Sequence, residues 1–80
     1  MAKLIKANGD IVPNVDISSL EKKQDLVQGY IQLSHLDNGK VLIVNEEGLL
    51  NNLPPNKKAS ELRGYLLVGD VIECGISELK

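Results

Sequence analysis

The chain has 80 residues, 42% of them hydrophobic, and a net charge of −2. This length and composition are typical of one folded domain, here spanning residues 1–80, and not of a disordered chain. The nine Lys and Arg are spread along the chain rather than gathered in a basic stripe, so we expect no binding to DNA or RNA.

Two short strands are predicted near the start of the chain, at Lys3 to Lys6 and at Asp10 to Val15. Asn8-Gly9 lies between them and is a common tight-turn sequence, because both residues tolerate a positive φ. Pro13 cannot donate a hydrogen bond to a neighbouring strand. We therefore expect the second strand at an edge of the sheet or at a bulge.

A helix is predicted next, at Ser19 to Gln28. Ser18 and Glu21 have the spacing of a capping box at its start, and Gly29 is placed for a left-handed cap at its end. The apolar residues that fall on one stripe of this helix are Leu20, Leu26 and Val27.

The pattern then predicts a second hairpin. Tyr30 to His35 alternates large and polar residues, Asp37-Asn38-Gly39 is a turn sequence, and Lys40 to Asn45 carries the apolar run from Val41 to Val44. A strand that is apolar on both faces belongs in the centre of a sheet. Either helices cover both faces, or helices cover one face and a partner chain covers the other.

The polar segment that follows has local structural explanations. We expect Glu46 to Leu50 to make a short helical turn and Pro54-Pro55 to set the direction of the chain. Asn56 can cap a second helix that ends at Gly64, and we expect its inward-facing residues to be Ala59 and Leu62.

A last strand is predicted at Asp70 to Cys74. The element order is then β-β-α-β-β-α-β. This order predicts an α+β fold, a small and mostly antiparallel sheet with two short helices packed on it.

Catalytic chemistry is not expected from these residues. His35 is the only histidine, and no nucleophile motif surrounds it. Glu46 and Glu47 are adjacent, so their side chains diverge and do not face one reacting atom. One His and one Cys cannot make a closed zinc site, and we expect Cys74 to be a buried thiol. We therefore expect no enzymatic activity, no metal and no cofactor.

Binding residues are easier to nominate. Asn56, Lys57 and Lys58 open the predicted second helix, and Arg63 follows near its end. Lysines at a helix start oppose the helix dipole, so they are either surface residues or are kept for an anionic ligand. Tyr30 and Tyr65 are the only aromatic residues. They either stack on a flat ligand or are the largest packing residues of the core.

The segments GYIQ, VLIVNEEGLL, LPPNKKA and GDVIECG resemble a family of small domains of unknown function, the domain of unknown function 3846 type, found in phages and other mobile elements of bacteria. One departure from its pattern is Lys57-Lys58, where the family more often has Arg and then Ala. The matching positions are Gly29, Tyr30, Asn45, Glu46, Glu47, Gly48, Leu53, Pro54, Asn56, Lys57, Gly69, Cys74 and Gly75.

The resemblance implies a phage-type protein that works by binding. Our leading hypothesis is that it sequesters a small anionic nucleotide signal of bacterial immunity. Tyr30 or Tyr65 would stack on a base and Asn45 would hydrogen-bond a base or ribose. The phosphate would lie near Asn56. The full predicted ligand site is Tyr30, Asn45, Glu46, Asn56, Lys57, Lys58, Arg63 and Tyr65.

The alternative hypothesis is a protein-interaction module that inhibits a host protein through an exposed strand edge or the acidic face around Glu46 and Glu47. Both hypotheses allow a homo-oligomer, which we expect because the core of so short a chain is small. No apolar run approaches the roughly 18 residues of a membrane helix, and the N-terminus lacks the apolar region of a secretory signal. We expect no membrane association and a cytoplasmic location, in the host cell if the protein is phage-encoded.

Overall fold

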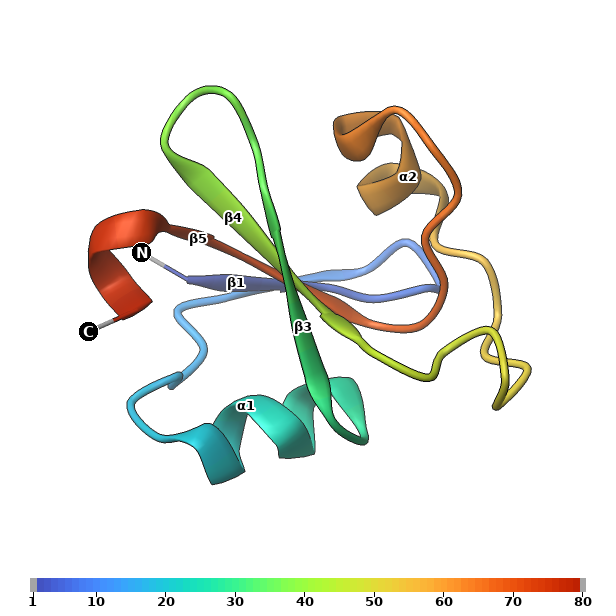
Figure 1. Ribbon diagram of the computed structural model, residues 1–80, viewed down its shortest axis with the longest axis horizontal. Coiled ribbons are helices and arrows are strands. Elements are labelled where there is room, and N and C mark those ends of the chain that lie inside the picture. The colour runs from blue at the N-terminus through green and yellow to red at the C-terminus, as the bar shows by residue number, and fades with distance from the viewer. Residues whose placement is uncertain (1, 80) are drawn as a thin grey trace.

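The computed structural model describes residues 2–79, which form one antiparallel sheet with a helix on each face (Figure 1). The strand order across the sheet is β2-β1-β5-β4-β3. The expected α+β fold and element order are confirmed, and a short 3-10 helix, η1, follows the last strand. The elements are β1 (Lys3–Ile5), β2 (Ile11–Pro13), α1 (Leu20–Val27), β3 (Ile31–His35), β4 (Lys40–Asn45), α2 (Lys57–Arg63), β5 (Val71–Gly75) and η1 (Ile76–Leu79).

The first hairpin, β1 and β2, places β2 at one edge of the sheet. This is the position expected for a strand that contains Pro13. In the Asn8-Gly9 pair only Gly9 has a positive φ, of 99°. β2 ends at Pro13, short of the predicted Val15, because Asn14 has a left-handed φ of 58° and redirects the chain.

The start of α1 differs from the prediction by one residue. Its N-cap is Ser19, whose Oγ accepts a hydrogen bond of 3.2 Å from the backbone N of Lys22. The predicted capping box from Ser18 to Glu21 is therefore wrong. Ser18 belongs to the preceding turn, where its backbone N donates to Oδ1 of Asp16 at 2.9 Å.

The apolar stripe and the end of α1 also differ from the prediction. Val27 is buried and Leu26 is half-buried. Leu20 is 55% exposed, because it is the first residue of the helix and lies at its N-terminal end. The left-handed C-cap is Gln28, with φ of 66°, and not Gly29. The glycine at 29 has a packing role, described with the site below.

The second hairpin matches its prediction except that β3 begins at Ile31, one residue later than predicted. The turn at residues 37–39 is closed by a hydrogen bond of 2.8 Å from the N of Leu36 to the O of Lys40, and Gly39 has φ of 79°. β4 lies between β3 and β5, so its predicted central position is confirmed. The other edge of the sheet is β3.

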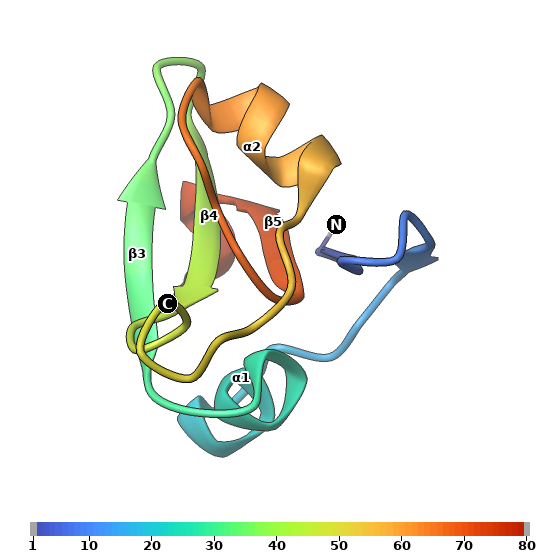
Figure 2. The same cartoon turned by 90° about the vertical axis from the view of Figure 1, so that its right-hand side faces the viewer.

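The sheet has an apolar core on each face because the side chains of β4 alternate. Figure 2 shows α1 and α2 on opposite sides of the sheet. On the α1 face the buried residues are Ala2, Leu4, Ile17, Val27, Val41, Ile43, Ile72 and Cys74. On the α2 face they are Leu42, Val44, Ala59, Leu67 and Val71.

α2 is capped as predicted. Oδ1 of Asn56 accepts from the N of Ala59 at 3.0 Å, and Gly64 takes the left-handed C-cap with φ of 92°. Ala59 is fully buried, so the expected inward position is confirmed for it. The inward position predicted for Leu62 is wrong, because it lies over a polar pocket beside Lys40 and is 48% exposed.

The segment after β4, residues 46–52, forms consecutive turns and not a helix. The N of Asn51 donates to the O of Glu47 at 2.9 Å, a bond with helical spacing, so the predicted helical turn is limited to this bond. Further on, β5 begins at Val71, one residue later than predicted, because Asp70 uses its carboxylate to accept a hydrogen bond of 2.9 Å from the N of Ala7.

Candidate functional site

A groove of about 420 Å³ lies between the turns after β4 and the segment that leads into β5. Three leucines on it are largely exposed, with exposed fractions of 71% for Leu49, 79% for Leu50 and 61% for Leu66. Side chains this apolar are usually covered when they cluster. The remaining lining residues are Gln32, Val44, Asn45, Glu46, Glu47, Gly48, Leu67 and Val68.

The two walls of the groove are held together by backbone contacts. Pro55 and Val68 form an isolated antiparallel bridge. On either side of it, the N of Asn56 donates to the O of Leu67 at 2.8 Å, and the N of Gly69 donates to the O of Pro54 at 2.7 Å. The segment before α2 and the segment before β5 are therefore fixed side by side, which positions Leu66.

Gly48 allows the turns to pack against this ladder. A Cβ at position 48 would lie 2.7 Å from Cγ2 of Val68 and 3.4 Å from the O of Asn45. Contacts under 3.0 Å are essentially never seen for a Cβ, so a larger residue would push the turns away. The glycine thus allows the close approach of the turns to Val68, and the turns carry Leu49 and Leu50 on the same groove as Leu66.

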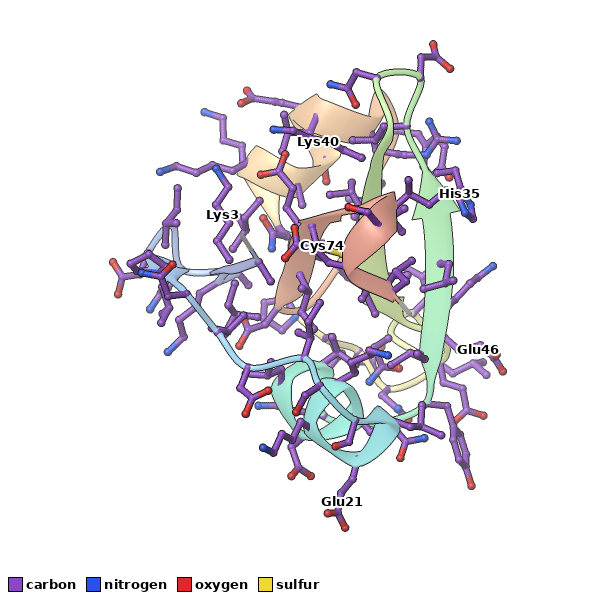
Figure 3. The ribbon with its side chains drawn as sticks, turned by 90° about the vertical axis from the view of Figure 1, so that its left-hand side faces the viewer. Lys3, Glu21, His35, Lys40, Glu46 and Cys74 are labelled. Atoms are coloured by element: carbon purple, nitrogen blue, oxygen red, sulfur yellow. The ribbon has the colours of Figure 1, made fainter. Side chains whose placement is uncertain are left out.

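The rim of the groove is acidic. Glu46 and Glu47 line it and are exposed, while none of its lining residues among residues 2–79 is Lys or Arg. Figure 3 shows Glu46 beside β3, pointing outward. A groove with apolar walls and a negative rim favours a partner that presents apolar side chains next to positive charge.

Asn45 uses its side chain within the fold. Its Nδ2 donates to the O of Val27 at 3.0 Å and to the O of Gln28 at 3.2 Å, and its Oδ1 accepts from the N of Glu47 at 2.8 Å. It is 6% exposed. The side chain therefore connects the end of α1 to the turns after β4. Gly29 makes room for it, because a Cβ there would lie 2.8 Å from this Nδ2.

Asn56 is occupied in the same way. It is fully buried, its Nδ2 donates to the O of Ile5 and to the O of Gly69 at 2.8 Å each, and its Oδ1 caps α2. Lys57 and Lys58 follow it on the surface, and both are exposed. The start of α2 therefore offers two solvated lysines, while its asparagine connects β1 and the segment before β5 to the helix.

Arg63 and Tyr65 contact each other at the other end of α2. The guanidinium lies 4.7 Å from the ring centroid, and its Nε donates to the tyrosine hydroxyl at 3.0 Å. Hydrogen bonds from Ser34 and then from Arg63 lower the pKa of Tyr65 below its ordinary value. The guanidinium of Arg63 thus already occupies one face of the Tyr65 ring, and the tyrosine hydroxyl lies near Ser34 of β3.

The two tyrosines lie at different places along β3. Tyr30 directly precedes the strand and is 65% exposed, and its O accepts from the N of Glu46 at 2.8 Å. Tyr65 has its hydroxyl near Ser34, four residues further along. Four residues of a strand span about 13 Å. Neither tyrosine is a core residue.

The predicted site residues thus fall into three groups rather than one pocket. Tyr30, Asn45 and Glu46 lie near the groove, Asn56, Lys57 and Lys58 lie at the start of α2, and Arg63 and Tyr65 lie at its end. Sequence reasoning missed the three exposed leucines. Their signal was an apolar pair, Leu49-Leu50, inside a polar turn segment where no core residue was needed.

No group of three or more His, Cys, Asp or Glu within residues 2–79 is arranged to hold a metal ion. His35 points outward from β3 (Figure 3). None of the helices within the same residues is long and apolar enough to cross a membrane.

Comparison with known proteins identifies a family. The model of the family described as Domain of unknown function (DUF3846) matches residues 1–79, so the chain belongs to this family. The resemblance to this family is confirmed, whereas the role of the GYIQ, NEEG and LPPN segments and the phage origin stay predictions. No curated protein and no solved structure matches the chain.

Proposed function

We propose that this member of the DUF3846 family is a non-enzymatic protein-interaction module. It would hold an apolar segment of a partner protein in the groove lined by Leu49, Leu50 and Leu66, which we call the leucine groove. The single observation that carries the proposal is the exposure of Leu49, Leu50 and Leu66 together around one groove. Interface cores are formed by such apolar clusters inside a polar rim.

The partner segment has a definite chemistry. Its apolar side chains would pack between the three leucines, and Lys or Arg next to them would face Glu46 and Glu47 on the rim. The exposed carboxylates would contribute to the rate and selectivity of binding more than to its affinity. The partner is therefore a protein with an exposed apolar segment flanked by basic residues, in keeping with the hypothesis of an inhibited host protein.

Sequestration of a nucleotide signal stays a prediction. In its support, Arg63 and Tyr65 offer a cation and a ring at the surface. The groove itself has an acidic rim, which repels phosphate, and the side chains of Asn45 and Asn56 already bond to the backbone. The geometry thus supports a protein segment in the groove better than a nucleotide.

Short synthetic peptides test the proposal by fluorescence anisotropy. Each would carry a central leucine pair flanked by Lys and Arg, by Asp and Glu, or by Ser. We expect the basic peptides to bind and the acidic ones not to bind. A protein that binds all three classes equally, or binds nucleotides in the same assay and no peptide, contradicts the proposal.

Variants locate the binding. Leu50→Glu and Leu66→Glu should each weaken peptide binding by at least about tenfold. Losing the side chain of an interface anchor typically costs roughly 2 kcal/mol or more of binding free energy. Leu20→Glu is the matched control, since Leu20 is an exposed leucine on α1, 55% accessible and outside the groove. If Leu20→Glu weakens binding as much as Leu50→Glu, the groove is not the site.

A further inference from the structure

β3 is an unprotected edge of the sheet. It pairs with β4 on one side only, and Figure 2 shows it as the outermost strand, at the left of the view. Natural proteins usually protect such an edge with a proline, a lysine, a bulge or a very short strand. The opposite edge, β2, has three residues and ends at Pro13. The five residues of β3 carry none of these protections, and their register with β4 is continuous.

The backbone groups of β3 alternate in direction. In an antiparallel pair, residues whose N–H and C=O bond to the neighbouring strand alternate with residues whose groups point away from it. Two hydrogen bonds of 2.8 Å at the ends of the β3-β4 hairpin fix this alternation. The N of Glu46 donates to the O of Tyr30, and the N of Leu36 donates to the O of Lys40. Every second residue from 30 to 36 therefore bonds to β4.

The residues of β3 whose backbone groups point outward are Ile31, Leu33 and His35. Within residues 2–79 no segment lies beyond β3 in the sheet, and none bonds to these groups from outside the hairpin. The side chains of Leu33 and His35 are also exposed, so the edge is accessible. Such a row of free donors and acceptors is a template for another strand.

The leucine groove reaches this edge. Gln32 lines the groove, and it pairs with Val44, a core residue of the α2 face. In a strand added beside β3, the side chain opposite Gln32 would lie on the same face and next to the groove. The residues before and after it would bond to the outward groups of β3. One extended segment can therefore use the edge and the groove together.

The charges on the rim give the added strand a direction. Each strand pair within residues 2–79 is antiparallel, which is also the slightly more stable arrangement. Glu46 bonds to Tyr30, directly before β3, so the acidic rim lies at the start of this strand. An antiparallel neighbour reaches the start of β3 with its C-terminal end. Its basic residues would therefore follow its apolar ones.

We propose that the partner segment binds as an antiparallel strand added to β3, with alternate side chains in the leucine groove and basic residues at its C-terminal end. This inference rests on the proposed function and assigns the bound segment a conformation and a direction. Main-chain hydrogen bonds supply affinity in this mode of recognition, and the groove supplies selectivity. A second copy of the chain would compete for the same edge.

N-methylated peptides test the added strand by fluorescence anisotropy. In the peptide Thr-Leu-Thr-Leu-Thr-Lys-Arg the leucines would face the groove, and the central threonine would donate its N–H to Leu33. Methylating that nitrogen should weaken binding by at least about tenfold. Methylating the nitrogen of the second leucine is the matched control and should change little, because this N–H faces solvent. Moving Lys-Arg to the N-terminal end should weaken binding by about threefold, as expected for exposed charge pairs.

A proline variant tests the edge itself. Leu33→Pro removes an outward N–H and no bond to β4, and an edge strand tolerates proline at such a position. It should weaken peptide binding by at least about tenfold, whereas Leu33→Ala, which also loses the leucine side chain, should bind like the native chain. Circular dichroism checks that both variants fold.

Hydrogen exchange followed by NMR gives a test on the native chain. The bound peptide should slow exchange of the amides of Ile31, Leu33 and His35, and should change Gln32 and Ser34 little, because these already bond to β4. The inference is overturned if exchange shows no such alternation, if both methylated peptides bind alike, or if the reversed peptide binds more tightly. Binding that is lost in Leu50→Glu but ignores methylation would remove the added strand and leave the proposed function standing. If no peptide binds, both fail.

Discussion

The side-chain Nδ2 of Asn56 donates a hydrogen bond of 2.8 Å to the backbone O of Ile5, which is 51 residues away in the sequence. Through this bond the residue that caps α2 also holds β1, the strand that enters the sheet from the N-terminal hairpin. The same nitrogen donates to Gly69, just before β5. One buried amide therefore connects three segments that the sequence places far apart.

Asn56→Ala should lower the free energy of unfolding by about 3 kcal/mol, combining roughly 1 kcal/mol for the lost cap with the cost of leaving buried carbonyls unbonded. Urea unfolding followed by circular dichroism measures this. Asn56→Asp separates the two effects, because it keeps the cap acceptor and removes both donors. We expect Asn56→Asp to be destabilised as well, whereas Asn51→Ala, at an exposed asparagine, should change little. A loss below about 1 kcal/mol in Asn56→Ala would contradict this role.

Gly29→Ala should destabilise the fold through a contact with Asn45 and not through the backbone of residue 29. The added Cβ would lie 2.8 Å from Nδ2 of Asn45, which the carbonyls of Val27 and Gln28 hold in place. A double-mutant cycle by urea unfolding tests this. In an Asn45→Ala background the added cost of Gly29→Ala should fall close to zero. Equal costs in the two backgrounds would show that the clash with Asn45 is not the cause.

Cys74 should make stability fall at alkaline pH. Burial raises the pKa of its thiol, and the side chain is 2% exposed. Because the folded protein holds this proton more tightly than the unfolded chain does, the contribution is complete below the unfolded pKa of about 8.5 and is lost as pH rises through the folded pKa. The stability difference between the native chain and Cys74→Ala should therefore narrow above about pH 8.5, measured by urea unfolding across pH. A stability difference between the two proteins that stays constant up to roughly pH 10 would contradict this role of Cys74.

Self-association, expected from the small core, should use β3. This strand is a sheet edge of five residues with no proline, Lys, Arg, Asp or Glu, so two copies can pair antiparallel without repulsion between like charges. The β2 edge is shorter and contains Pro13. Leu33→Lys should shift a dimer to monomer in sedimentation equilibrium, whereas Val12→Lys on β2 should not. Loss of the dimer only with Val12→Lys would place the interface at the other edge.

Local chemistry explains why much of the fold was predictable. Gly39 closes a hairpin at a turn signal, Asn56 and Gly64 cap a helix at both ends, and the apolar run of β4 requires cover on both faces. The errors at α1 also have a local origin, because Ser18 and Ser19 are both good caps and the preceding turn at Asp16 decides between them. Backbone preferences act over a few residues, so a single sequence records them well.

The candidate site was less predictable because it depends on which segments meet. The sequence by itself determined the strands, the helices, their order and the aliphatic nature of the core. Only the tertiary structure decided that Leu66 lines the same groove as Leu49 and Leu50, and that Lys3 and Lys40 lie on either side of Glu73. The pairing of β5 with both β1 and β4 brings the last group together. Contacts of this kind depend on strand order and register, which no local pattern of residues records.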